Sequence, residues 1–228
     1  MQGVRNDGKV RTLTTACPPK RIMGGNIKKN STFESFTKTD KINLKTKVDL
    51  ASFNNDWYQP GGNSIKTLLW FCCNAIFLNS YTFPINSLKV NLLRLFGAQI
   101  GKGVIIKPKV NIKYPWKLSV GDYSWIGEKV WIDNLAEVII EDNCCLSQGA
   151  MLLTGNHNYK KPTFDLMIGQ IQLKSGVWVG AKAVVCPGVK LGENAILTVG
   201  SIASGDLEAN GIYRGNPAVF VKKREIRK

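Results

Sequence analysis

An aliphatic side chain returns at every sixth position between Ile100 and Glu208 of this chain, with few interruptions. A period of six matches neither the 3.6-residue period of an α-helix nor the two-residue alternation of a single strand. Fourteen of the fifteen positions in this series are Ile, Leu or Val. The series is Ile100, Ile106, Ile112, Val120, Ile126, Ile132, Ile140, Leu146, Leu152, Leu173, Val179, Val185, Leu191, Leu197 and Ala203.

This period predicts a parallel β-helix in which each hexad supplies one short strand and one corner. Three hexads close a triangular coil, with the aliphatic side chain pointing into the prism. The side chain four positions later is usually small or β-branched, as at Val104, Cys144 and Ala195, and fills the same layer. Because no coil can bury its own inner face, only the stack is stable. We therefore predict an all-β fold of about five coils over residues 98–209.

The chain outside the hexads divides into four further parts. Residues 158–172 interrupt the repeat and must leave it as a loop at one corner, and loops of that length are usually functional. Residues 48–97 form a helical cap over the open edge of the first coil. Its predicted helices are Ser64–Phe77, with Ser64 as N-cap, and Pro84–Phe96, ended by Gly97. Residues 1–47 are interpreted as a basic, disordered extension, and residues 210–228 as a basic tail.

The formal net charge of +15 is unevenly distributed, because residues 1–47 hold eleven basic and three acidic side chains. A basic chain can bind nucleic acid, an anionic membrane surface or an anionic small ligand. No nucleic-acid-binding motif is present, so nucleic acid is the weakest of these interpretations. The longest apolar stretch, Leu68–Leu78, is about half of the ~20 residues that a spanning helix needs. Peripheral contact with a membrane stays open.

The six cysteines include no C-x-x-C pair, and the chain has a single histidine. We therefore expect no metal site, and this also argues against a β-helix carbonic anhydrase, which needs about three histidine ligands. The cysteine pattern is typical of a reduced, cytoplasmic protein. Neither phosphate-binding glycine motif occurs, which excludes the nucleotidyltransferases that carry a β-helix beside a nucleotide-binding domain.

The single histidine, His157, stands where the loop departs from the third coil. An imidazole is the natural base for taking a proton from a hydroxyl group near neutral pH. From position alone, an ordinary surface histidine on a polar loop is an equal interpretation.

Four segments accompany the hexads: Val177-Trp178-Val179-Gly180-Ala181, Pro187-Gly188-Val189, Gly192-Glu193-Asn194-Ala195 and Gly215-Asn216-Pro217-Ala218. Together they resemble the hexapeptide-repeat acyltransferases, whose fold is a left-handed parallel β-helix, and the resemblance covers about residues 48–223. Three further segments are Phe53-Asn54-Asn55-Asp56-Trp57-Tyr58, Tyr114-Pro115-Trp116-Lys117-Leu118 and Gly155-Asn156-His157-Asn158-Tyr159. Within that superfamily, these three are similar to the colanic-acid-type acetyltransferases of exopolysaccharide gene clusters.

The resemblance implies a homotrimer with acetyl-CoA in the cleft between neighbouring prisms. It implies that His157 is the general base toward the acceptor hydroxyl. The backbone N–H of Ala181, which follows the Trp-Val-Gly turn, would polarise the thioester carbonyl, and Trp178 in the same turn would contact acetyl-CoA. Val199 and Ser204 would line the pantetheine arm. Lys222 matches a basic position near the CoA phosphates.

This chain departs from many relatives, which have Thr-Lys where it has Ser204-Gly205. One phosphate contact is therefore lost, unless Lys222, Lys223 or Arg224 replaces it. The alternative for these three residues is a solvated basic tail.

Four polar residues are candidates for sugar contacts: Asp133, Asn134, Asn156 and Asp165. The alternative for Asp133 and Asn134 is local hydrogen bonding at a corner. Trp116, Trp125, Trp131 and Trp178 suit either carbohydrate stacking or packing between subunits, and we favour packing for Trp125.

We therefore predict an acetyl-CoA-dependent O-acetyltransferase that acts on a sugar or a lipid-linked oligosaccharide in exopolysaccharide biosynthesis. An N-acetyltransferase for an amino sugar would share nearly every feature. A non-catalytic β-helix scaffold is the third hypothesis, and it predicts no binding of CoA.

Overall fold

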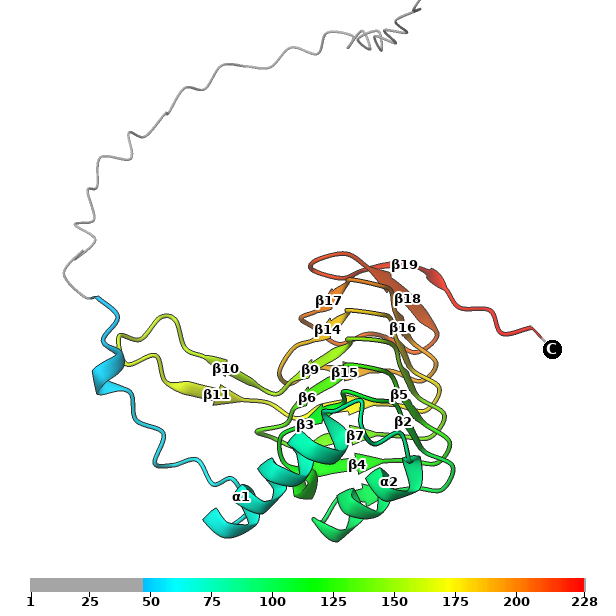
Figure 1. Cartoon of the computed structure of the whole chain (residues 1–228). Coiled ribbons are helices and arrows are strands. Elements are labelled where there is room, and N and C mark those ends of the chain that lie inside the picture. The colour runs from blue at the N-terminus through cyan, green and yellow to red at the C-terminus, as the bar shows by residue number, and fades with distance from the viewer. Residues whose placement is uncertain (1–46, 228) are drawn as a thin grey trace, which may run out of the picture. The chain divides into compact units, whose positions relative to one another are not determined.

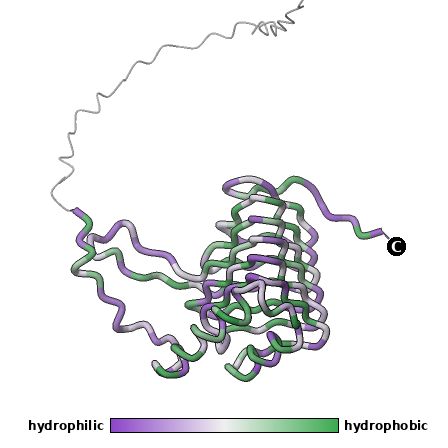
Figure 2. The backbone as a smooth tube through the Cα atoms, in the orientation of Figure 1, coloured by the Kyte–Doolittle hydropathy of each residue, from purple (hydrophilic) through white to green (hydrophobic). Residues whose placement is uncertain are grey.

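A computed structural model describes residues 47–227, so the extension expected over residues 1–47 lies almost entirely outside the described residues. The described part is mostly β-structure: a parallel β-helix preceded by helices (Figure 1). The hexad prediction is confirmed, because all fifteen aliphatic positions are buried. Apolar and polar stretches alternate along each coil (Figure 2).

Three sheets form the faces of the prism, and we number the faces in chain order. Face 1 contains β1 (Gln99–Ile100), β4 (Leu118–Val120), β7 (Val138–Ile140), β12 (Ile171–Leu173) and β15 (Lys190–Leu191). Face 2 contains β2 (Ile105–Ile106), β5 (Trp125–Ile126), β8 (Cys145–Leu146), β13 (Trp178–Val179), β16 (Ile196–Leu197) and β18 (Gly211–Arg214). Face 3 contains β3 (Asn111–Ile112), β6 (Trp131–Asp133), β9 (Met151–Leu153), β14 (Val184–Val185) and β17 (Ile202–Ala203).

The coil spacing appears in the register of face 1. Ile100 pairs with Val120 and Val120 with Ile140, so the first coils, which lie lower in Figure 1, repeat every twenty residues. Leu173 pairs with Leu191, so the upper coils repeat every eighteen. The two extra residues per coil contribute to the core, because Leu118 and Val138 add a second buried apolar side chain to β4 and β7.

A sixth, partial turn closes the upper end of the prism. β18 pairs in parallel with β16, and β19 (Val219–Lys223) then pairs antiparallel with β18. Residues 211–223, which we interpreted as part of a basic tail, are therefore mostly strands of face 2. An antiparallel strand at the end of a parallel stack terminates the series of coils.

The helices cover the lower end, as expected. α1 (Ser64–Cys73) continues into a π-helical turn, η2 (Asn74–Leu78), and α2 is Asn86–Leu95. The N-cap of α1 is Asn63, whose side chain accepts the Lys66 N–H, so the prediction of Ser64 was wrong by one residue. Gly97, at φ 102°, follows α2 in the left-handed conformation that favours glycine. No helix of residues 47–227 is long and apolar enough to cross a membrane.

Polar side chains of the cap satisfy the unpaired edge of the first coil. The Asn86 side chain donates to the Val104 carbonyl at 2.8 Å and accepts the Ile106 N–H at 2.7 Å. The buried Lys89 ammonium donates to the Lys107 carbonyl at 3.2 Å. These bonds replace the neighbouring coil that β2 lacks, because a buried backbone group without a partner is costly. Two short 3-10 helices complete the set: η1 (Leu50–Ser52) and η3 (Pro115–Lys117).

The interruption of the repeat is a two-stranded antiparallel ribbon. β10 (Gly155–His157) pairs with β11 (Leu166–Ile168), and the ribbon projects away from the prism (Figure 1). It begins at Gly155, three residues before the predicted loop. The chain has already rejoined face 1 at Ile171, where the loop was expected to run to Gln172.

Candidate active site

His157 lies on β10, and its imidazole is held from three sides. Its Nδ1 is 2.8 Å from the Phe164 carbonyl oxygen, and the Phe164 ring stacks on the imidazole with centroids 4.5 Å apart and planes 9° apart. The Phe53 ring meets the imidazole edge-on at 5.7 Å. A carbonyl oxygen can only accept, so Nδ1 must carry a hydrogen, and in the neutral imidazole the lone pair is then on Nε2. The imidazole is thus arranged to accept a proton at Nε2.

A cavity of about 600 Å³ opens beside His157. One wall comes from the N-terminal segment, which is tied to the ribbon by a hydrogen bond of 2.9 Å from the Asp49 N–H to the Pro162 carbonyl. The cavity is lined by Phe53, Asn55, Asp56, Tyr58, Pro60, Lys113, Tyr114, Leu135, His157 and Leu166. Of these residues, only His157 was a predicted site residue, although the motif that begins at Phe53 was a sequence signal for the first four.

Tyr58 and Lys117 organise the side of this cavity nearest the prism. The Tyr58 hydroxyl donates to the Leu135 carbonyl at 2.9 Å, and Lys117 Nζ donates to the same carbonyl at 2.7 Å and to the Tyr58 oxygen at 3.2 Å. Burial, reinforced by nearby Tyr114 and Asp133, raises the pKa of Tyr58 well above its usual value. Burial also lowers the pKa of Lys117. The Tyr58 hydroxyl and the Lys117 ammonium are therefore hydrogen-bonded to each other and to the Leu135 carbonyl.

Asp133 does not line this cavity but pairs with Lys113, which does, and Asn134 is part of the adjoining corner of the prism. Asp133 Oδ1 is buried without a well-aligned hydrogen bond, but Lys113 Nζ at 3.1 Å supplies the counter-charge. Lys113 itself lines the cavity. The fully buried Asn134 amide accepts the Tyr114 N–H at 2.9 Å and donates to the Tyr114 and Lys117 carbonyls. The burial of this amide and its bonds within the corner favour the alternative that we gave for Asn134, local hydrogen bonding.

The other two candidates for sugar contacts lie on the ribbon. Asn156 is exposed, and its side-chain oxygen accepts the His157 N–H at 2.8 Å. The Asp165 carboxylate pairs with Lys161 at 2.7 Å and accepts the Thr163 hydroxyl, and these two bonds hold the pKa of Asp165 below its usual value. Asp165 does not line the cavity, so its carboxylate is a local tie within the ribbon.

Ala181 stands at the corner where the chain turns from face 2 into face 3. Its N–H reaches no acceptor among the described residues, whereas the flanking Gly180 and Lys182 N–H groups are bonded to the neighbouring coils. Trp178, three residues earlier on β13, is 45% exposed and donates from Nε1 to the Ser147 hydroxyl at 2.9 Å. Val199 occupies the same corner one coil higher and is 70% exposed. This corner therefore offers an outward N–H beside exposed apolar groups.

Ser204 and Lys222 do not share that corner. Ser204 follows β17, at the corner between faces 3 and 1, and is exposed. Lys222 is exposed on β19, opposite Ile212. Of its basic neighbours, Arg224 Nη1 donates to the Gly176 and Asn194 carbonyls at 2.9 and 3.1 Å, so it serves the fold.

His157 and Ala181 lie at opposite edges of face 3. The ribbon leaves after β9, at the end of that face, whereas Ala181 precedes β14, at its beginning. The strands β9 and β14 span three and two residues and advance about 3.3 Å per residue, so the strands alone separate the two edges by roughly 7–10 Å. The ribbon leads away from the prism (Figure 1). Within one chain, this imidazole and this N–H therefore stand at opposite edges of face 3.

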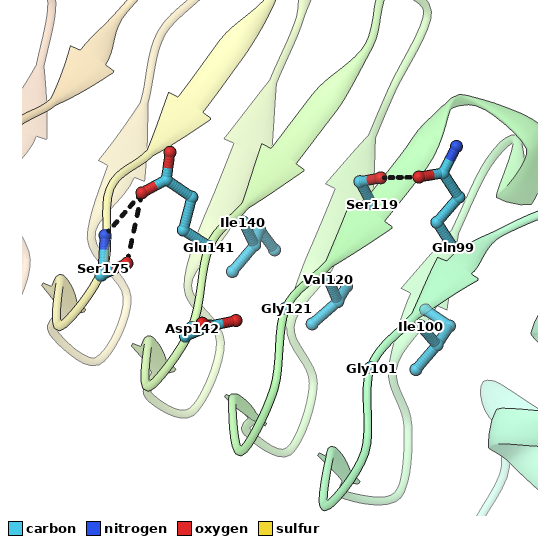
Figure 3. Close-up of a pocket in the computed structure, with 10 residues that line it drawn as sticks. All are labelled: Gln99, Ile100, Gly101, Ser119, Val120, Gly121, Ile140, Glu141, Asp142 and Ser175. Atoms are coloured by element: carbon cyan, nitrogen blue, oxygen red, sulfur yellow. Dashed lines mark hydrogen bonds between the residues drawn. The ribbon is translucent and has the colours of Figure 1, made fainter.

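A second hollow, of about 580 Å³, lies at the corner between faces 1 and 2 (Figure 3). Its acidic groups serve the stack: Asp142 Oδ1 accepts the Asp122 N–H at 2.7 Å, and Glu141 Oε2 accepts the Ser175 N–H at 3.1 Å. Burial alone would raise the pKa of Glu141, but the ammonium of Lys174 and the Ser175 donors outweigh it and lower that pKa. No imidazole or thiol lines this hollow.

Comparison with known proteins identifies relatives of this chain, although no family model matches it. It is 37% identical over 176 residues to the Escherichia coli (strain K12) protein named "Putative colanic acid biosynthesis acetyltransferase WcaF", which covers 77% of this chain and 97% of that protein. Among solved structures, a hexapeptide-repeat-containing acetyltransferase from Vibrio cholerae complexed with acetyl coenzyme A superposes with a TM-score of 0.64 at 17% identity, covering 71% of this chain and 88% of the other. A galactoside acetyltransferase in complex with coenzyme A gives 0.63 at 22% identity, covering 71% and 82%.

Proposed function

The chain belongs to the hexapeptide-repeat acetyltransferases of the colanic acid biosynthesis type, and from that premise we propose that it transfers the acetyl group of acetyl-CoA to a sugar hydroxyl in exopolysaccharide assembly. The observation that carries the proposal is the orientation of His157, whose Nδ1 is bound to the Phe164 carbonyl while the residue lines a cavity. That arrangement leaves a basic nitrogen where an acceptor hydroxyl would bind.

In this mechanism, Nε2 of His157 takes the hydroxyl proton as the sugar oxygen attacks the acetyl carbon of the thioester. The free N–H of Ala181 donates to the carbonyl oxygen as that oxygen becomes negative. When the carbon–sulfur bond breaks, His157 returns the proton to the CoA sulfur. The acetyl group ends on the sugar oxygen, and His157 regains its starting state.

The proposal includes a homotrimer in which two neighbouring chains form each site. The separation of His157 and Ala181 within one chain supports this, because the two groups must act on one acetyl group. Exposed aromatic side chains on faces 2 and 3, among them Trp125 and Trp131, suit burial between prisms. Val199 and Lys222 would then contact the pantetheine arm and the CoA phosphates, while Ser204, at a different corner, is the weakest of these assignments.

The test is the His157→Ala variant, assayed for acetyl transfer and for CoA binding on one preparation. Loss of a general base should lower kcat by about 10²–10⁴-fold. The Kd for CoA, measured by calorimetry, should change by less than about tenfold, because CoA contacts the prism and not the ribbon. Galactosides, maltose and amino sugars serve as acceptor probes, with mass spectrometry of the product. Tyr159→Leu, an exposed aromatic residue on the same ribbon, is the matched control.

Three outcomes separate the hypotheses. Parental turnover in His157→Ala would remove the general base from the mechanism. Acetylation of nitrogen and not of oxygen in the amino sugars would favour an N-acetyltransferase. Failure of the parental protein to bind CoA at all would leave the non-catalytic scaffold.

A further inference from the structure

Phe164 has an unusual backbone conformation for a residue of its type. Its φ is 52°, in the left-handed region that a bulky side chain rarely adopts. The other non-glycine residues with positive φ in residues 47–227 all lie in the tight turns at coil corners, where the conformation recurs with the repeat. Phe164 alone among them belongs to the ribbon. Such a conformation persists only where the surroundings hold it in place, and it is frequent at functional sites.

The surroundings of Phe164 do hold it in place. Its N–H donates to the Lys161 carbonyl at 3.1 Å, and the next residue, Asp165, accepts the Asn158 N–H at 2.8 Å through its carbonyl. The Asp165 side chain is tied to Lys161 and Thr163. The tip of the ribbon is thus a closed set of hydrogen bonds around this one residue.

The left-handed conformation lets one residue contact His157 twice. The stacked Phe164 ring fixes the plane of the imidazole, but a 180° rotation about the Cβ–Cγ bond restores that plane and exchanges Nδ1 with the carbon Cδ2. The Phe164 carbonyl removes this ambiguity, because it accepts a hydrogen bond from Nδ1. Phe53 meets the imidazole edge-on and comes from the N-terminal segment, more than a hundred residues away in the chain.

We propose that Phe164 and Phe53 are positioning residues that hold His157 in the tautomer and orientation in which Nε2 faces the cavity as a base. The proposal rests on the proposed function, since it assigns these residues to the same site. It adds that the N-terminal segment, through Phe53, is part of the catalytic arrangement and not only a cover for the first coil. Neither phenylalanine takes part in proton transfer.

A spectroscopic test is direct because the chain has a single histidine. Tag-free protein with ¹⁵N-labelled imidazole gives one pair of ring-nitrogen signals, which report the tautomer at alkaline pH where an imidazole is neutral. We expect the parental protein to show protonated Nδ1 and unprotonated Nε2. Phe164→Leu and Phe53→Leu keep the Phe164 carbonyl but remove a ring that holds the imidazole against it, so the imidazole should leave the carbonyl part of the time and show a mixture of tautomers. Phe164→Tyr, which keeps the ring, should resemble the parent.

Kinetics on the same variants supply a second readout. Phe164→Leu and Phe53→Leu should lower kcat by about tenfold to a hundredfold, as misplacement of a catalytic group does, while the Kd for CoA stays unchanged. Phe164→Tyr should recover turnover to within about twofold of the parent. Tyr159→Leu on the same ribbon should change neither the spectrum nor kcat. If Phe164→Leu fails to fold, Phe164→Gly takes its place, because glycine adopts the left-handed conformation without strain.

The inference is overturned if Phe164→Leu, or Phe164→Gly in its place, keeps the parental tautomer and turnover. It is also overturned if the parental protein shows Nε2 protonated. These results are distinct from a failure of the proposed function, which would appear as full activity in His157→Ala. The tautomer is measurable whether or not an acceptor has been found.

Discussion

Ala181 contributes to the proposed chemistry through its backbone and not through its side chain. Pro108 occupies the equivalent place in the turn three coils lower, so proline fits this corner and removes only the N–H. Ala181→Pro should therefore fold normally and lower kcat by about 10²–10³-fold, the usual effect of losing one oxyanion donor. Gln148→Pro is the matched control, since its N–H at the same corner also reaches no acceptor among the described residues. Equal turnover in both variants would remove Ala181 from the mechanism.

Cys144 makes a prediction about stability at alkaline pH. The side chain is 1% exposed, its Sγ donates to the Lys174 carbonyl at 3.1 Å, and burial raises the pKa of the thiol to about 11. The unfolded chain loses this proton near pH 9, before the folded protein does, so the unfolded state binds fewer protons above that pH. The stabilising effect is therefore complete below about pH 9 and declines as pH rises toward 11, by up to about 3 kcal/mol in the free energy of unfolding.

The free energy of unfolding, measured with denaturant between pH 8 and 11, should decline with the slope that about one titrating thiol gives. In Cys144→Ala the decline should be smaller, and the substitution should be tolerated because Ala183 and Ala195 fill the same layer in other coils. Cys72→Ala, at an exposed thiol, should retain the parental decline. An unchanged slope in Cys144→Ala would contradict the argument.

At the level of elements, the ribbon is separable from the prism. Gly155 lies opposite Ile168, so residues 156–167 can be replaced by an Asn-Gly turn that closes the ribbon at its base. The three faces use no strand of the ribbon, and we expect the variant to keep a cooperative melt within a few degrees of the parent. Acetyl transfer should fall at least as far as in His157→Ala, while CoA still binds. A large loss of stability would mean that the ribbon supports the coils.

The helical cap shows where a prediction from sequence ends. Both predicted helices occur, but α1 gives way to a π-helical turn at Asn74. The cause is tertiary: the buried Asn74 side chain donates to Asn111 at 2.7 Å and accepts the Ile112 N–H, so the helix end is shaped by the edge of face 3. Propensity within the segment does not contain that contact.

For the whole molecule, the shared site makes a quantitative prediction. His157→Ala and Ala181→Pro should each be inactive alone, yet a one-to-one mixture assembled together should recover about a quarter of parental turnover. The reason is combinatorial: in a closed ring of three, three quarters of randomly mixed trimers contain both variants, and each of these holds one intact site of three. Co-expression with two different tags isolates the mixed species, and light scattering reports the number of chains.

An inactive mixture of correct size would place the base and the donor within one chain. A stable, active monomer would remove the trimer altogether. The homogeneous preparations of each variant, treated identically, are the controls.

The hexad period alone defines the prism, because an inward position recurs every six residues and each repeat reinforces the same register. The sequence also identified the family, and it placed His157 on the one large excursion from the coils. The tertiary structure decided what surrounds that residue. The ribbon pairing, the Phe53 contact and the burial of Asn134 join segments up to about a hundred residues apart, and no local period records such contacts. The hexad period did not predict the sixth turn for a related reason. β18 pairs with β19, which lies outside the repeat, so this strand is defined by its partners and not by residue spacing.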